Sequence, residues 1–384
     1  MYSMNPATTV DLWWIATPAD FEKMAVDLSR HSRLAVDTES NSLHAYKERV
    51  CLIQFSTGEK DYLVDPLALK DLSLLGPIFA NPQIEKVFHA AEYDLICLKR
   101  DYHFQFSNLF DTMLAGRILG RSEVGLAAML EAEFGIHLDK RFQRANWARR
   151  PLPAEWQAYA RLDTHYLLSL RERLLAELVS RGRWELARED FARACHTEVP
   201  NGNHHGGNPC WRISGSRDLS AQEASVLSEL CAFREEQARL SDVPPFKILG
   251  NETLLLLALD QPETFEDLEK VRGLGAWLVK RHGARLLDAI RRGRTSQPIQ
   301  PPPSAPKPKE DYIYRLEALR TWRKQTAEEM GVPSDVVLPR DLMEQIAQVN
   351  PRQRDGLDAL LRDLPWRKEH FGNAILAVIE EQEQ

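Results

Sequence analysis

The sequence predicts an α/β domain with a mixed sheet over its first two hundred residues, followed by an all-helical half built from two similar units. Strand-like runs alternate with helical stretches before residue 200, and only helical patterns follow. One pattern in the helical half recurs, since Ala232-Phe233-Arg234 returns as Thr321-Trp322-Arg323, 89 residues later. The recurrence indicates a duplicated helical domain and says nothing by itself about function.

Local signals justify the elements of the α/β part. Thr17-Pro18 supplies an N-cap and a first-turn proline that open a helix, and 33–39 then has the pattern of a strand. Runs at 50–56 and 61–64 are separated by Thr57-Gly58, which is typical of a hairpin. Further elements are expected as a strand at 86–88, a helix through Lys99, a strand at 109–110 and a helix capped by Asp111.

Two segments rich in loop-forming residues divide the chain. Residues 199–209 concentrate Gly, Asn and Pro, and residues 294–309 hold six prolines, which leave no room for a helix. A domain at 1–195, a helical domain at 210–293, a proline-rich linker at 294–309 and a second helical domain at 310–384 are therefore expected.

Composition narrows the class of protein. The net charge is -7, from 49 Lys and Arg against 56 Asp and Glu, so nucleic acid must be bound by local basic patches. Hydrophobic residues at 43% and charged residues at 27% exclude a disordered chain or a coiled-coil rod. Five scattered cysteines without a CxxC motif predict reduced thiols rather than disulfides or a zinc site. With no leader-like start and no long apolar run, a soluble, cytoplasmic monomer without a membrane segment is expected.

Acidic residues stand near the ends of predicted elements. Asp37 and Glu39 lie two residues apart on the first apolar strand, so both project from the same face. Two adjacent carboxylates favour a bound cation, although a solvated strand end has the same pattern. Asp94 lies where a strand gives way to a helix. Tyr159 and Asp163 have the i, i+4 spacing of one helical face, which also fits a buried hydrogen-bonded pair.

Together these motifs resemble those of a known enzyme family. Asp-Thr-Glu at 37–39, FHAAEYD at 88–94 and Tyr-x-x-x-Asp at 159–163 match the three motifs of DEDDy 3′→5′ exonucleases, and more closely those of the ribonuclease D family. The segment DVPPF at 242–246, with Ile248-Leu249, is similar to the HRDC domain, which that family commonly carries twice.

The resemblance implies a ribonuclease H-like exonuclease domain with a mixed sheet, followed by two all-α HRDC-like domains. It also implies that Asp37, Glu39, Asp94 and Asp163 are metal-binding carboxylates and that Tyr159 is the tyrosine of the subclass. His89 and His165 flank the motifs but are not required ligands of a four-carboxylate site. Hard oxygen ligands suit two divalent cations, Mg²⁺ or Mn²⁺, better than zinc.

In such an arrangement two ions hold the scissile phosphate, activate the attacking water and stabilise the leaving 3′ oxygen. The products are nucleoside 5′-monophosphates. A tyrosine with an ordinary pKa of about 10 is better suited to orient the water than to remove its proton. We therefore expect Tyr159 to position the water.

Two basic patches are candidates for contacts with RNA. The first interleaves cations with Phe142 and Trp147, as expected beside a stacking platform, although a solvated helix face is the alternative. The second, 270–294, has eight Lys or Arg against one acid, and its glycines also fit a tight turn. The candidate RNA-binding residues are Lys140, Arg141, Arg144, Trp147, Arg149, Arg150, Lys280 and Arg281. By contrast, core positions are expected for Trp211, Trp277, Trp322 and Trp366.

The sequence thus predicts a metal-dependent 3′→5′ exoribonuclease that trims the 3′ ends of tRNA precursors and other structured RNAs. A DNA exonuclease of the same superfamily remains an alternative, because the metal site acts on phosphate and does not distinguish the sugars. An RNA-binding module with an inactive nuclease domain is a second alternative, which predicts missing carboxylates.

Overall fold

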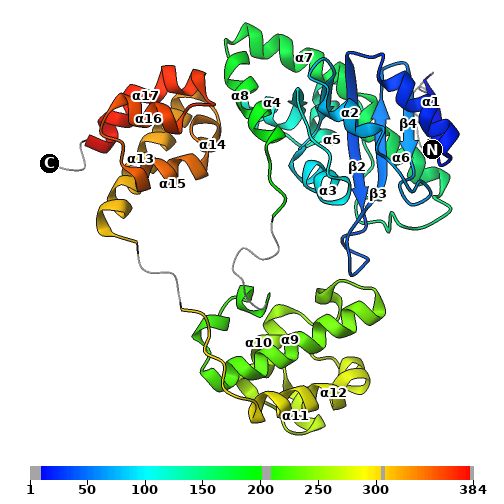
Figure 1. Ribbon diagram of the computed structural model, residues 1–384, viewed down its shortest axis with the longest axis vertical. Coiled ribbons are helices and arrows are strands. Elements are labelled where there is room, and N and C mark those ends of the chain that lie inside the picture. Colours follow the sequence, from blue (N-terminus) through cyan, green and yellow to red (C-terminus); the bar gives the residue numbers. More distant parts are fainter. Residues whose placement is uncertain (1–9, 201–208, 304–307, 381–384) are drawn as a thin grey trace. The chain divides into compact units, whose positions relative to one another are not determined.

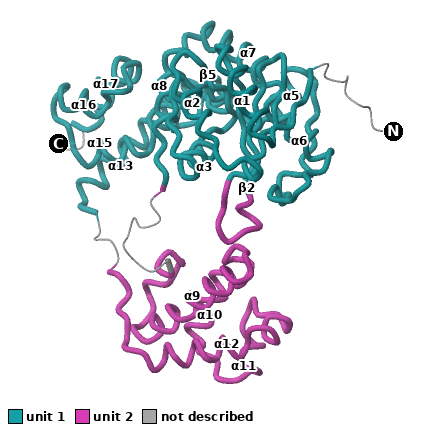
Figure 2. The backbone as a smooth tube through the Cα atoms, turned by 45° about the vertical axis from the view of Figure 1, so that its right-hand side comes forward, with its two compact units in different colours: residues 1–40, 50–199, 308–384 teal, residues 41–49, 200–307 magenta. Residues whose placement is uncertain are grey.

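The structure is a computed structural model that describes residues 10–200, 209–303 and 308–380. It divides into two compact units (Figure 2). Unit 1 comprises residues 1–40, 50–199 and 308–384, and unit 2 comprises residues 41–49 and 200–307.

A six-stranded sheet in the order β1-β4-β3-β2-β5-β6 forms the core of the α/β part of unit 1. Its strands β2, β3 and β4 are labelled in Figure 1. The strands are β1 (Asp11–Ile15), β2 (Arg33–Ser40), β3 (Val50–Ser56), β4 (Lys60–Val64), β5 (Glu85–Phe88) and β6 (Leu109–Asp111). The hairpin neighbours β2, β3 and β4 pair antiparallel, whereas β1 with β4, β2 with β5 and β5 with β6 pair parallel. The predicted mixed sheet is confirmed. The edge strand β1 was not expected.

Helices surround this sheet. They are α1 (Pro18–Leu28), α2 (Leu75–Ala80), α3 (Glu92–Tyr102), α4 (Thr112–Ile118), α5 (Leu126–Phe134), α6 (Ala154–His165), α7 (Leu167–Ser180) and α8 (Trp184–Cys195). The predicted caps are present, since Thr17 accepts from the Asp20 amide and Asp111 accepts from the amides of Met113 and Leu114. Every residue of β3 is buried, and α6 packs against β2, β3 and β4. The site helix α6 is therefore held over the middle of the sheet.

The C-terminal helices of unit 1 have a core of their own. They are α13 (Glu310–Met330), α14 (Ser334–Val337), α15 (Arg340–Val349), α16 (Arg354–Leu360) and α17 (Pro365–Glu380). Contacts between α17 and α8 attach them to the α/β part.

Unit 2 is helical, with α9 (Ala221–Ser241), α10 (Asn251–Asp260), α11 (Phe265–Lys270) and α12 (Ala276–Thr295). Ser220 and Glu223 form a reciprocal capping box at the start of α9. Cys210 and Cys231 form a disulfide, so the expectation of reduced thiols throughout is wrong for this pair, whereas Cys51, Cys97 and Cys195 are free and buried. Spacing alone gave no signal for a pair that only the folded helices bring together.

The duplication is visible in matching contacts of the two helical regions. Arg234 on α9 donates to the Leu249 carbonyl at 3.4 Å, and Arg323 on α13 donates to the Leu338 carbonyl at 3.0 Å. Both helices end at a left-handed residue, Asp242 in one and Gly331 in the other. In both copies, an arginine at the equivalent position thus donates a hydrogen bond to the segment that follows its helix.

One predicted core tryptophan is on the surface. Trp277 is 63% exposed, so the expectation that it anchors the helical core is wrong. Trp211, Trp322 and Trp366 are partly buried and pack against the helical cores, as expected. Among the described residues, no helix is long and apolar enough to cross a membrane.

Candidate active site

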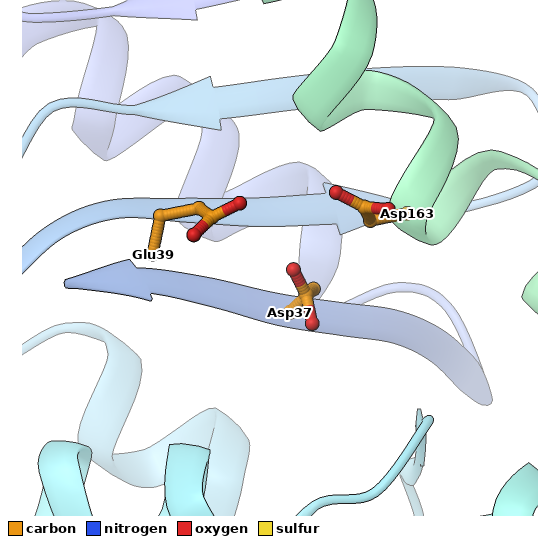
Figure 3. A group of neighbouring side chains, drawn as sticks. All are labelled: Asp37, Glu39 and Asp163. Carbon is orange, nitrogen blue, oxygen red and sulfur yellow. The ribbon is translucent and has the colours of Figure 1, made fainter. Parts of the chain in front are cut away.

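Three of the predicted carboxylates converge on one point of unit 1. Asp37 and Glu39 project from the same face of β2, and Asp163 faces them from α6 (Figure 3). Each offers an oxygen that lies within 4.8 Å of the others. The alternation of the strand and the packing of α6 over β2 create this cluster from residues more than a hundred positions apart.

The fourth predicted carboxylate, Asp94, flanks this cluster. It lies in the first turn of α3, is only 7% exposed, and accepts a hydrogen bond from the hydroxyl of Thr38, the residue between Asp37 and Glu39. Asp94 is not one of the three residues whose oxygens come within 4.8 Å of each other. The charge of Asp37 nevertheless acts on it, so the two carboxyls are electrostatically linked.

Burial and mutual repulsion raise the pKa of every carboxyl in this group. The pKa of Asp37, Glu39 and Asp94 lies well above the usual range, with desolvation the largest cause and a neighbouring carboxylate the next. The same causes, burial and then Asp94, raise the pKa of Asp163 to about 7. A cation relieves this repulsion, and an all-oxygen donor set fits a hard divalent metal.

Tyr159 lies one helical turn before Asp163 and contributes to the same cavity. Burial, followed by the charges of Asp163 and Glu39, raises the pKa of its phenol. The hydroxyl therefore stays protonated at neutral pH and is available as a hydrogen-bond donor.

Asp37, Glu39 and Asp163 line a cavity of about 450 Å³. Its lining combines the acidic cluster with the start of α5 and the segment that precedes α6. The lining residues are Asp37, Thr38, Glu39, His89, Glu123, Gly125, Leu126, Ala127, Ala128, Leu138, Asp139, Lys140, Gln143, Tyr159 and Asp163.

Comparison with known proteins identifies the domains of the chain. Residues 12–179 match a family model described as 3'-5' exonuclease, and residues 223–290 and 314–379 match the HRDC domain. Ribonuclease D of Pseudomonas paraeruginosa is 28% identical over 97% of this chain and 99% of its own length. Along nearly its whole length the chain is therefore similar to ribonuclease D, and these matches indicate a 3′→5′ exoribonuclease.

Two further comparisons extend this assignment. Protein RRP6-like 3 of Arabidopsis thaliana is 34% identical over 66% of this chain. The matched region covers 31% of that longer protein. The solved structure of Escherichia coli RNase D has a TM-score of 0.69 at 24% identity and covers 96% of this chain and 98% of its own. The fold is therefore that of ribonuclease D, an α/β exonuclease region followed by helical HRDC regions.

Two residues of the predicted RNA-binding patch stabilise the fold instead. Trp147 is 1% exposed and packs against Trp156 and Tyr159, so its expected role as a base-stacking platform is wrong. Arg150 binds both oxygens of Asp65 at 2.7 Å and donates to the Cys51 carbonyl. The bond from its guanidinium to Cys51 connects the loop before α6 to strand β3 of the sheet.

The other residues of this patch lie at the surface. Lys140 lines the cavity, and Arg144 is exposed. Arg141 pairs with Asp139 and lies 5.3 Å from the Phe142 ring centroid. Arg149 is exposed and lies 5.8 Å from the ring centroid of Trp156.

In unit 2, Lys280 and Arg281 are exposed on α12. Arg281 lies over the ring of Trp277, with 5.0 Å from the guanidinium carbon to the ring centroid. Trp277 is thus an exposed aromatic residue beside cations, which is the arrangement expected from the sequence for Trp147.

Sequence reasoning missed several residues that support the site. Gln54, opposite Asp37 in the sheet register, is fully buried, and neither atom of its amide has a hydrogen-bond partner. His165 lies 2.7 Å from Asp61, which also accepts from Arg161. His89 is not a carboxylate and is not expected to be a metal ligand, but it lines the cavity. The spacing of motifs in the sequence does not predict strand register or which residues line a cavity, because both depend on the folded structure.

Proposed function

We propose that this site hydrolyses RNA from its 3′ end in a metal-dependent reaction that releases nucleoside 5′-monophosphates. The convergence of Asp37, Glu39 and Asp163 carries the proposal, because three repelling carboxylates at one point favour bound cations. With Asp94 alongside, we assign the four residues to two divalent cations, Mg²⁺ or Mn²⁺. When bound, such ions supply Lewis-acid stabilisation of the phosphate and of the leaving oxygen.

The chain's own residues have separable roles. Asp37, Glu39 and Asp163 would hold the cations, and Thr38 fixes the orientation of Asp94 through a hydrogen bond. Tyr159 retains its proton, so its hydroxyl donates a hydrogen bond that orients the attacking water rather than removing a proton from it.

For the substrate, we propose structured RNA with a single-stranded 3′ tail, notably precursors of tRNA. The name of the Pseudomonas relative, a ribonuclease, supports RNA over DNA. The metal site does not distinguish the two sugars, so a DNA exonuclease is the competing outcome.

For the RNA contacts, we propose exposed cations in both units. In unit 1 these are Lys140, which lines the acidic cavity, and the exposed Arg141, Arg144 and Arg149 of the same segment. In unit 2, Lys280 and Arg281 flank Trp277, which offers a ring on which a base can stack.

The domain division at 1–195, 210–293 and 310–384, with a linker at 294–309, is retained as part of the proposal. Helix α12 extends to Thr295, so the predicted linker begins inside this helix, and α13 begins at Glu310, which supports a connection between two helical domains. A cytoplasmic monomer also remains a proposal.

A trimming assay tests the function. A 5′-labelled hairpin RNA with a single-stranded 3′ tail is incubated with the protein and Mg²⁺, Mn²⁺ or EDTA, beside a DNA of the same sequence. We expect metal-dependent shortening of the RNA tail that stops near the duplex. Equal shortening of the DNA would favour the DNA exonuclease, and equal degradation of a blunt hairpin would contradict trimming.

A further inference from the structure

His89 lies directly after β5 and lines the cavity that holds the acidic cluster. Its ring is partly buried, and its Nδ1 lies 2.9 Å from the Thr112 hydroxyl at the start of α4. It is neither a carboxylate nor part of the proposed metal set.

The partners of Thr112 fix the tautomer of this histidine. The Thr112 hydroxyl also lies 3.1 Å from the Phe88 carbonyl, which can only accept a hydrogen bond. The single hydroxyl hydrogen therefore goes to Phe88, and the hydroxyl oxygen accepts from Nδ1–H of His89. Burial lowers the pKa of His89, which favours the neutral ring. Nε2 is then a lone-pair acceptor.

The backbone around His89 is anchored independently of the metal cluster. The Asp111 carboxylate accepts from the amides of Ala90 at 3.1 Å and Ala91 at 2.8 Å. Ala90 has φ 60°, a left-handed conformation that costs energy for a residue with a Cβ. Asp111 and Thr112 thus hold the turn and the ring together.

The Nε2 atom has no assigned protein donor. Within the part of the chain that the structure describes, the one hydrogen bond of the His89 side chain is that to Thr112. The cavity lining includes carboxylates, which accept rather than donate when ionised, and the possible donors Lys140, Gln143 and Tyr159, none of which bonds to Nε2 in the described part of the chain. A ligand bound in the cavity can therefore supply the donor that Nε2 lacks.

We propose that Nε2 of His89 accepts a hydrogen bond from a ribose hydroxyl at the 3′ end of the RNA. This inference rests on the proposed function, since it places an RNA end in the cavity. Ribose hydroxyls are donors that all four nucleotides share, whereas the N–H groups of the bases differ. His89 is thus a substrate-binding residue suited to an enzyme that removes any nucleotide.

Two substitutions separate the two nitrogens of the ring. In His89→Asn the amide nitrogen takes the place of Nδ1 and keeps the bond to Thr112, but no acceptor remains at the place of Nε2. In His89→Gln the longer side chain brings an amide oxygen to the place of Nε2. The Asn variant tests the acceptor, and the Gln variant tests whether it can be restored.

The test compares kcat/KM on one tailed RNA and on three versions of it. These lack the terminal 2′-hydroxyl, the terminal 3′-hydroxyl or the penultimate 2′-hydroxyl. For wild type we expect a loss of about five- to tenfold with one of the three. In His89→Asn that ratio should fall to about one, and His89→Gln should restore part of it.

Other outcomes overturn the inference. An unchanged ratio in His89→Asn, or equal loss on all four RNAs, would reduce His89 to a structural residue. So would a wild type that ignores all three hydroxyls while trimming normally. Absence of metal-dependent trimming by wild type would instead contradict the proposed function itself. The affinities for AMP and for its 2′- and 3′-deoxy forms, measured in Mg²⁺, would then decide whether the cavity recognises the ribose hydroxyls.

Discussion

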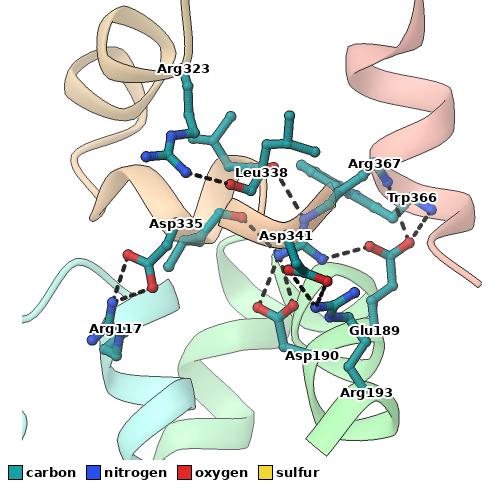
Figure 4. A network of polar contacts seen from close by, with 12 residues as sticks. Arg117, Glu189, Asp190, Arg193, Arg323, Asp335, Leu338, Asp341, Trp366 and Arg367 are labelled. Carbon is teal, nitrogen blue, oxygen red and sulfur yellow. Dashed lines mark hydrogen bonds and ion pairs between the residues drawn. The ribbon is translucent and has the colours of Figure 1, made fainter. Parts of the chain in front are cut away.

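Arg367 on α17 forms an ion pair with Glu189 on α8 at 2.8 Å, and the arginine side chain is fully buried (Figure 4). It also pairs with Asp190 at 2.8 Å and donates to the carbonyls of Val336 and Val337. Two surface pairs, Arg117 with Asp335 and Arg193 with Asp341, flank this contact. The buried Arg367 guanidinium and these two surface pairs thus bind the last helical region to the α/β region.

Replacing Arg367 should destabilise unit 1. In Arg367→Met the buried Glu189 carboxylate loses its counter-charge, and removing one partner of a buried pair costs about 3–5 kcal/mol. Denaturant unfolding measures this cost. The matched control is Arg320→Met, whose exposed pair with Glu317 should contribute less than about 1 kcal/mol. Equal stability of the two variants would contradict the role assigned to Arg367.

Without metal, the acidic cluster should destabilise the fold as pH rises. The pKa of Asp163 is about 7 in the folded protein against an ordinary value of 3.8, so the native state binds more protons between these values. Stability must therefore fall as pH rises through that window. In EDTA at pH 8, Asp163→Asn should have a higher Tm than wild type, by about 2–4 °C per kcal/mol of repulsion removed.

The same melting experiment has an internal control. The advantage of Asp163→Asn should shrink toward pH 4, where the wild-type carboxyl is protonated, and Mn²⁺ should raise the Tm of wild type more than that of the variant. A variant no more stable than wild type at pH 8 would show that the carboxylates do not repel as described.

Tyr159→Phe should slow the reaction without removing metal. The ring still packs against Phe142 and Trp147, but the hydroxyl that orients water is lost. We expect kcat to fall about 10- to 100-fold with little change in KM. Metal binding followed by calorimetry should be unchanged. Full activity of this variant would remove Tyr159 from the mechanism.

Trp277→Ala should weaken binding of single-stranded RNA by about 1–3 kcal/mol, because one stacking ring is lost. Affinity is measured in an Asp163→Asn background so that the RNA stays intact. Arg281→Gln should also weaken binding and flatten its salt dependence. The control is Arg291→Gln, on the same helix but paired with Asp288. Equal affinities for all variants would exclude α12 as an RNA contact.

The sequence predicted the mixed sheet without its edge strand β1, and it predicted which acidic residues share a face, because both depend on local pattern. Asp37 and Glu39 share a face through strand alternation, and Tyr159 and Asp163 through helical spacing. Roles that depend on burial were not predictable. Trp147 and Trp277 are both aromatic residues near cations, and only tertiary packing decides that the first is buried and the second exposed. The Cys210–Cys231 disulfide depends in the same way on how the helices fold.

Release of mononucleotides from a tailed RNA tests the central claim most directly. Wild type and Asp163→Asn are compared in Mg²⁺, Mn²⁺ and EDTA, with the variant first shown to fold by its melting curve. The account predicts metal-dependent shortening from the 3′ end by wild type and a loss of at least about a thousandfold in the variant. Unchanged shortening by Asp163→Asn, or shortening in EDTA, would contradict a reaction centred on Asp37, Glu39 and Asp163.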